Sequence, residues 1–116
     1  MLRVVLYSNV LVSATISDGR SRELLQRGMA KRFSIVTSDL ILQELISVLS
    51  RPEFEISKEE INTIIPVLKR SSEVVIVKSK LEAVKNDPKD DMIIETAYDG
   101  KADIIVTGGN HLLASL

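Results

Sequence analysis

Short apolar runs alternate along this chain with longer stretches in which apolar residues recur at helical spacing. The runs cover residues 2–6, 33–36, 74–77 and 104–106. Apolar runs of this length are typical of strands buried on both faces of a sheet. The stretches between them place apolar residues three and four positions apart, which is the spacing of one helix face. Strands that alternate with helices predict an α/β fold, with right-handed crossovers and helices on both faces of a mostly parallel sheet.

Polar residues mark where the predicted helices begin and end. The starts are expected at Ser21, at Thr37–Asp39, at Ser57 with Glu60 in a capping box, and at Asp90–Asp91. Pro66 lies inside the third of these helices and predicts a kink or an early end. Gly100 is expected to stop the fourth helix. After a turn at residues 107–110, His111–Leu113 is expected to begin one last helical turn.

Composition limits the kind of protein. A chain of 116 residues predicts one domain over residues 1–116, and aromatic residues at 3% mean that its core must be aliphatic. The absence of cysteine excludes disulfides, thiolate catalysis and cysteine zinc sites, and it fits a reducing compartment. No apolar run approaches the roughly 20 residues that span a bilayer. The run at 2–6 is too short for a signal peptide, so we expect a cytoplasmic protein without a membrane partner. Because the chain ends soon after the run at 104–106, a last strand or helix is expected to be missing or supplied by a partner.

Candidate chemistry is expected at the carboxyl ends of the strands, where sites form in open parallel sheets. The residues that follow the strands there are mostly polar: Tyr7, Ser8, Asn9, Asp39, Glu44, Thr107 and Asn110. No phosphate-binding glycine loop of the GxGxxG or Walker type occurs, and His111 is the single histidine. Carboxylates, hydroxyls and amides remain, and clustered carboxylates favour Mg²⁺ or Mn²⁺. The net charge of −1 neither requires nor excludes a nucleic-acid partner.

Four segments together resemble the PIN-domain family. In chain order they are VVLYSNVLVSA at 4–14, SDLILQEL at 38–45, DPKDDMII at 87–94 and ADIIVTG at 102–108. The resemblance covers essentially the whole chain, and Arg51–Phe54 is similar to the subgroup that contains toxins of toxin–antitoxin pairs (VapC-like ribonucleases). It implies a three-layer Rossmann-like fold with a sheet of four or five strands. It also implies a Mg²⁺- or Mn²⁺-dependent ribonuclease, with RNA and an antitoxin as candidate partners and a homodimer as the expected assembly.

The resemblance also assigns roles at the metal site. Carried over by position, Glu44 and Asp91 are the expected catalytic metal-binding acids, and Asp90 is a third candidate ligand. Tyr7 and Gly109 stand where the family has two further acids. The residues that keep polar character and support the site are Ser8, Asn9, Thr107 and Asn110, together with Tyr7 itself. His111 offers a nitrogen ligand, which would shift preference toward Mn²⁺ or Zn²⁺.

The two replaced acids predict weak or absent catalysis. A phenol is neutral at pH 7 and glycine has no side-chain oxygen, so the site loses two formal negative charges. Each charge–ion contact contributes about 4 kcal/mol at an effective dielectric near 20, before desolvation. Losing a third of that twice weakens metal binding by roughly two orders of magnitude. Two alternatives stay open: a non-catalytic module that binds RNA or protein, and a small-molecule-binding α/β domain.

Overall fold

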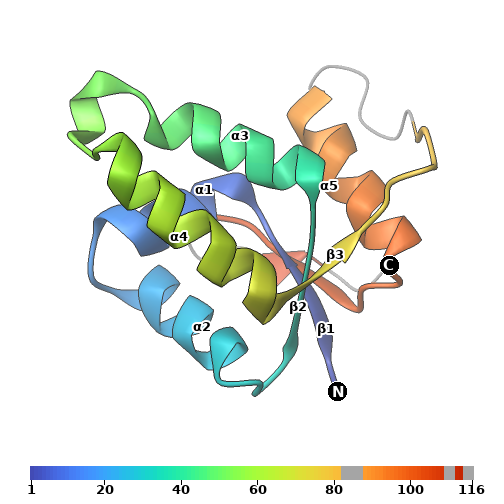
Figure 1. Cartoon of the computed structure of the whole chain (residues 1–116). Helices are drawn as coiled ribbons and strands as arrows, with labels where there is room; N and C mark the ends of the chain where they lie inside the picture. The colour runs from blue at the N-terminus through green and yellow to red at the C-terminus, as the bar shows by residue number, and fades with distance from the viewer. Residues whose placement is uncertain (82–87, 109–111, 114–116) are drawn as a thin grey trace.

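A five-stranded sheet forms the centre of the molecule (Figure 1). The computed structural model describes residues 1–81 and 88–108, together with the backbone of residues 112–113. The strands are β1 (Arg3–Leu6), β2 (Ser34–Ser38), β3 (Ser72–Val75), β4 (Ile104–Val106) and β5 (Leu112–Leu113). They are ordered β3-β2-β1-β4-β5, and the first four are parallel while β5 runs antiparallel to β4. The predicted α/β fold with a mostly parallel sheet is confirmed.

Helices cover the two faces of this sheet unequally. They are α1 (Ser8–Ile16), α2 (Arg20–Met29), α3 (Asp39–Leu49), a short 3₁₀ helix η1 (Pro52–Phe54), α4 (Lys58–Ser71) and α5 (Pro88–Asp99). Helices α1 to α4 lie on one side of the strands in Figure 1, and α5 lies on the other. The molecule therefore has three layers. No helix in the described ranges is long and apolar enough to cross a bilayer.

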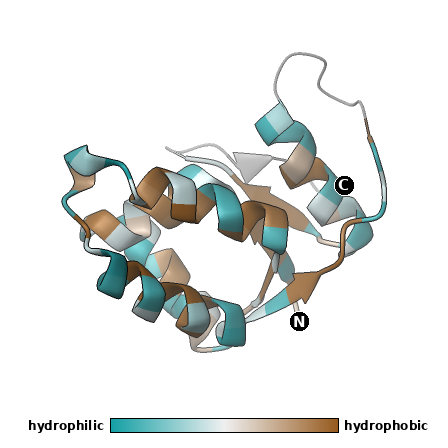
Figure 2. Cartoon of the chain, turned by 45° about the horizontal axis from the view of Figure 1, so that its top comes forward, coloured by the Kyte–Doolittle hydropathy of each residue, from teal (hydrophilic) through white to brown (hydrophobic). Residues whose placement is uncertain are grey.

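The core is aliphatic, as the composition predicts. Val5 of the central strand pairs with Val36 on one side and with Ile105 on the other, and all three side chains are buried. Helix α3 buries Leu45 and Leu49 against the sheet. Figure 2 shows the strands mostly apolar, whereas the helices alternate between apolar and polar faces. This division is what amphipathic helices on a buried sheet require.

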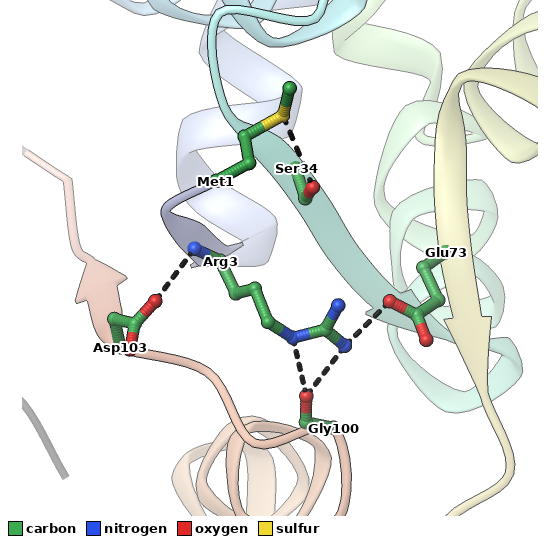
Figure 3. A network of polar contacts seen from close by, with 6 residues as sticks. All are labelled: Met1, Arg3, Ser34, Glu73, Gly100 and Asp103. Atoms are coloured by element: carbon green, nitrogen blue, oxygen red, sulfur yellow. Dashed lines mark hydrogen bonds and ion pairs between the residues drawn. The ribbon is translucent and has the colours of Figure 1, made fainter.

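A polar network ties the strands together near their amino ends (Figure 3). The Arg3 guanidinium donates through Nε and Nη2 to the carbonyl oxygen of Gly100, at 3.0 and 2.7 Å. The same Nη2 lies 2.5 Å from Oε2 of Glu73 on the edge strand β3. The backbone amide of Arg3 donates to the carboxylate of Asp103 at 2.9 Å. One side chain of β1 thus links β3 to the end of α5.

Two predicted helix features differ from the structure. Helix α2 begins at Arg20 and not at a Ser21 cap, because Gly19, with φ of +151°, turns the chain between α1 and α2. The guanidinium of Arg22 then donates to two carbonyl oxygens of the last turn of α1. Helix α4 does not end early at Pro66 but continues through it to Ser71. Because Pro66 is exposed, solvent can hydrate the carbonyl that the proline leaves without a donor.

Two strand predictions need correction. Strand β3 lies two residues earlier than the run at 74–77, since β2 ends at Ser38 and leaves Ile76 no strand to pair with. Leu112–Leu113 is a strand that pairs with Val106 and Ile105, not the start of a helical turn. A run of two leucines is too short for periodicity to separate the two possibilities.

Candidate active site

The carboxyl ends of β1 and β2 each lead directly into a helix. Tyr7 follows β1 and precedes α1, and its backbone amide donates to the Val106 carbonyl at 3.0 Å. Ser38 ends β2 and caps α3, where its hydroxyl accepts from the Ile41 amide. The same hydroxyl lies 2.8 Å from the Thr96 hydroxyl of α5, and both residues are buried. These contacts bring the first turns of α1 and α3 and the middle of α5 to one end of the sheet.

A hollow of about 450 Å³ opens beside this end of the sheet, among α1, α3, η1 and the first turn of α5. Its polar lining comes from Tyr7, Ser8, Asn9, Ser13, Glu44, Arg51, Lys89 and Asp90. Its apolar lining comes from Val12, Ile16, Val48, Phe54 and Ile93. The sequence prediction that residues after the strands converge at the carboxyl edge therefore holds for Tyr7, Ser8, Asn9 and Glu44.

Two polar pairs line the hollow. The Tyr7 hydroxyl donates to Oδ1 of Asp90 at 2.5 Å. The Lys89 ammonium lies 3.1 Å from Oε1 of Glu44. The Glu44 side chain is 21% exposed, whereas that of Lys89 is 60% exposed, so the pair lies at the mouth of the hollow. Both carboxylates that reach the hollow are therefore already paired with a donor from the protein.

Of the remaining predicted site residues, Asn9 lines the hollow, whereas Asp91 and Thr107 do not. Asn9 is exposed and lies close to Gly108, since a Cβ added to Gly108 would be 2.3 Å from Nδ2 of Asn9. Asp91 is half-buried on α5 and is not among the residues that line the hollow. Thr107 is half-buried just after β4. Gly109, Asn110 and His111 lie outside the described residues.

The side chains that the structure describes do not form a metal site of the expected kind. Across residues 1–81 and 88–108, no three acidic or histidine side chains lie close enough together to hold a metal ion. Hard divalent cations need several converging oxygen ligands, mostly anionic. In the hollow, Glu44 and Asp90 supply two carboxylates, and each is engaged by Lys89 or Tyr7. The arrangement that is seen does not fit Mg²⁺ or Mn²⁺.

A carboxylate with a shifted pKa lies away from the hollow. Asp99, at the far end of α5, accepts from the hydroxyl and amide of Ser79 and from the amide of Lys78. The hydroxyl of Ser79 and these backbone donors lower the pKa of Asp99 below its ordinary value of 3.8. Such bonds stabilise the charged carboxylate. Their role is to hold residues 78–79 against α5.

Sequence reasoning did not predict every residue that lines the hollow, and Arg51, Phe54 and Lys89 are among those that it missed. Arg51 and Phe54 belong to the segment that resembles one PIN subgroup, but nothing in their spacing predicts that they face the hollow. Lys89 directly precedes Asp90 in an acidic turn, and that unexpected positive charge was the available signal. Its partner Glu44 is distant in the sequence, so only the fold reveals the pair.

In this parallel sheet, polar residues follow the carboxyl ends of the strands and lie beside the first turns of helices. This arrangement is typical of α/β proteins that have a site at the carboxyl edge of the sheet. A family model, the PIN domain, matches residues 3–111. The chain belongs to the PIN-domain family, whose members are generally nuclease-like. No curated protein and no solved structure matches the chain significantly.

Proposed function

We propose that this protein is a PIN-domain ribonuclease whose Mg²⁺- or Mn²⁺-dependent cleavage of RNA is weakened or lost. The observation that supports the proposal is the pairing of both acids in the hollow. Glu44 is neutralised by Lys89, and Asp90 accepts from Tyr7. A cation that entered would have to break these pairs and would gain only two carboxylates from the hollow. Weak metal affinity, and hence weak catalysis, follows.

Tyr7 has a direct part in this loss. A phenol keeps its proton at pH 7, so at the position after β1 it donates a hydrogen bond and brings no negative charge. Its hydroxyl lies 2.5 Å from Asp90 and fills space beside that carboxylate. Replacement of an acid by tyrosine therefore removes one ligand and occupies a second.

RNA cleavage tests the proposal. Single-stranded RNA is incubated with the protein and Mg²⁺ or Mn²⁺, with Glu44→Gln and Asp91→Asn beside the wild type. We expect little or no metal-dependent cleavage by any of them. Glu59→Gln, at an exposed position in the first turn of α4, is the matched control. Strong cleavage by the wild type and the control that both site variants abolish would contradict the proposal and would establish an active metal site.

A second candidate function is a non-catalytic module that binds RNA, an antitoxin protein or a second copy of the chain. The pairing of Glu44 with Lys89 and of Asp90 with Tyr7 favours a binding function, because a PIN fold without a working metal site can still bind a partner. In a cytoplasmic toxin–antitoxin pair, the bound antitoxin would cover this surface. Size-exclusion chromatography with light scattering tests the homodimer, and a chain that is monomeric at every concentration would exclude it.

A further inference from the structure

The formal charges in the hollow cancel among its described residues. Glu44 and Asp90 contribute two negative charges, and Arg51 and Lys89 contribute two positive charges. Magnesium and manganese sites need a surplus of anionic oxygen. This hollow has no surplus, and its own ammonium group already lies 3.1 Å from Glu44. The balance of charge therefore does not suit a metal cation.

Among the described residues that line the hollow, Arg51 is the cation that remains for an anionic ligand. No described residue forms a hydrogen bond or ion pair with its guanidinium, whereas Lys89 is held by Glu44. The backbone of Arg51 is fixed between α3 and η1, since its amide donates to the Val48 carbonyl and its carbonyl accepts from the Phe54 amide, both at 3.1 Å. A guanidinium offers a planar fork of donors that matches phosphate oxygens.

The wall beside Arg51 is apolar and partly aromatic. Val12, Val48, Phe54 and the partly exposed Ile16 contribute to it. A flat heterocycle can lie against such a surface, and bases stack on aromatic rings with little sequence preference. A volume of about 450 Å³ is within the usual size of small-ligand sites. Hydroxyl and amide groups of Ser8, Asn9 and Ser13 are present for the sugar.

From this combination we infer that the hollow binds a nucleotide phosphate monoester without a divalent metal ion. Arg51 binds the phosphate, and the wall formed by Val48 and Phe54 takes the base. Lys89 remains with Glu44, where it replaces the charge that a metal ion would supply. The inference rests on the proposed function, because it requires that the hollow no longer holds a metal. A free mononucleotide and the phosphorylated 5′ end of an RNA present the same chemistry to this site.

Calorimetric titration in excess EDTA tests the inference with three probes: adenosine 5′-monophosphate, adenosine and inorganic phosphate. We expect the monophosphate to bind, and each of the other two to bind at least tenfold more weakly. Arg51→Met should weaken binding of the monophosphate at least tenfold, whereas Arg51→Lys, which keeps the charge but not the fork, should have an intermediate effect. The matched control is Arg70→Met, which removes an exposed arginine in the last turn of α4. A 5′-phosphorylated oligoribonucleotide that binds more tightly than the monophosphate would identify the RNA end as the ligand.

Three results would overturn the inference: no binding in EDTA, binding that appears only when Mg²⁺ is added, or equal loss in the Arg51 and Arg70 variants. Thermal unfolding of each variant shows whether it is folded, and Arg51→Lys carries the test if Arg51→Met is not. Failure here is separate from failure of the proposed function. Strong metal-dependent RNA cleavage that the site variants abolish contradicts the proposed function, whereas missing nucleotide binding without such cleavage contradicts only this inference.

Discussion

Two substitutions in the hollow should restore binding of a divalent metal. Tyr7→Asp returns a carboxylate to the position after β1 and removes the phenol that donates to Asp90. Lys89→Met removes the ammonium that lies 3.1 Å from Glu44. The double variant would direct three carboxylate side chains into a hollow where the wild type directs two. The net charge of the hollow becomes negative, which is the condition that a hard cation needs.

The size of the effect follows from Coulomb's law. Two unit charges about 4 Å apart interact by about 4 kcal/mol at an effective dielectric near 20. If desolvation leaves a third of that, about 1.4 kcal/mol, each substitution tightens metal binding about tenfold. The changes act on different partners of one ion, so the double variant should bind Mn²⁺ about 100-fold more tightly than the wild type does. Removal of the ion pair itself costs little stability, since exposed pairs contribute about 0.2–1 kcal/mol.

Calorimetry with Mn²⁺ measures this change, and the thermal shift on adding Mn²⁺ provides an independent reading. The control is Lys69→Met, which removes the lysine of a comparable pair with Asp39, 3.5 Å long and outside the hollow. It should leave Mn²⁺ affinity unchanged. If the wild type already binds Mn²⁺ at micromolar concentration, or if the double variant gains no more than the control, the argument from paired carboxylates is refuted.

Three further predictions concern stability. Arg3→Met removes two hydrogen bonds to the Gly100 carbonyl and an ion pair with Glu73 (Figure 3). The free energy of unfolding measured in urea should therefore fall by about 1–2 kcal/mol. An unchanged free energy of unfolding would refute a stabilising role for this network. The lowered pKa of Asp99 stabilises the fold above the ordinary carboxyl pKa of 3.8, and this is lost as the pH falls through the folded-state pKa. Asp99→Asn should therefore be less stable than the wild type at pH 7, and in urea unfolding the two should converge as the pH falls below the folded-state pKa of Asp99; a constant difference would contradict this. Gly28→Ala would place a Cβ 2.6 Å from the Ile35 side chain and should lower the free energy of unfolding by about 1–3 kcal/mol. An unchanged thermal unfolding temperature would show instead that the Ile35 side chain can move aside without loss of stability.

The fold was predictable because many residues contribute to each apolar run and to each helical spacing pattern. Four strands and four helices follow from apolar runs and helical spacing, and a shift of two residues in β3 does not change the topology. Helix α1 is one exception, since the pattern does not reveal it. Its Val10, Leu11 and Val12 are consecutive and all buried, so the helix has no continuous polar face that would show a helical period.

The candidate site was predictable only in part, because it depends on a few contacts between distant segments. The rule that sites form at strand ends located Tyr7 and Glu44, and the PIN resemblance located Asp90; all three line the hollow. Neither could show that Lys89 reaches Glu44 or that Arg51 faces the same space. Those placements depend on how α5 and η1 pack against α3, and helix packing is not encoded in any short motif.

The contacts that Lys89 and Asp90 make from the first turn of α5 also connect this helix to the rest of the fold. Lys89 and Asp90 are neighbours in the sequence, yet Lys89 bonds to α3 through Glu44 and Asp90 bonds to the end of β1 through Tyr7. Asp90 also lies at the amino end of α5, where a negative charge favours the helix dipole. In a metal site, such carboxylates repel one another until a cation arrives. Here Lys89 and Asp90 join three elements through their contacts with Glu44 and Tyr7, and these contacts fix α5 against the opposite layer.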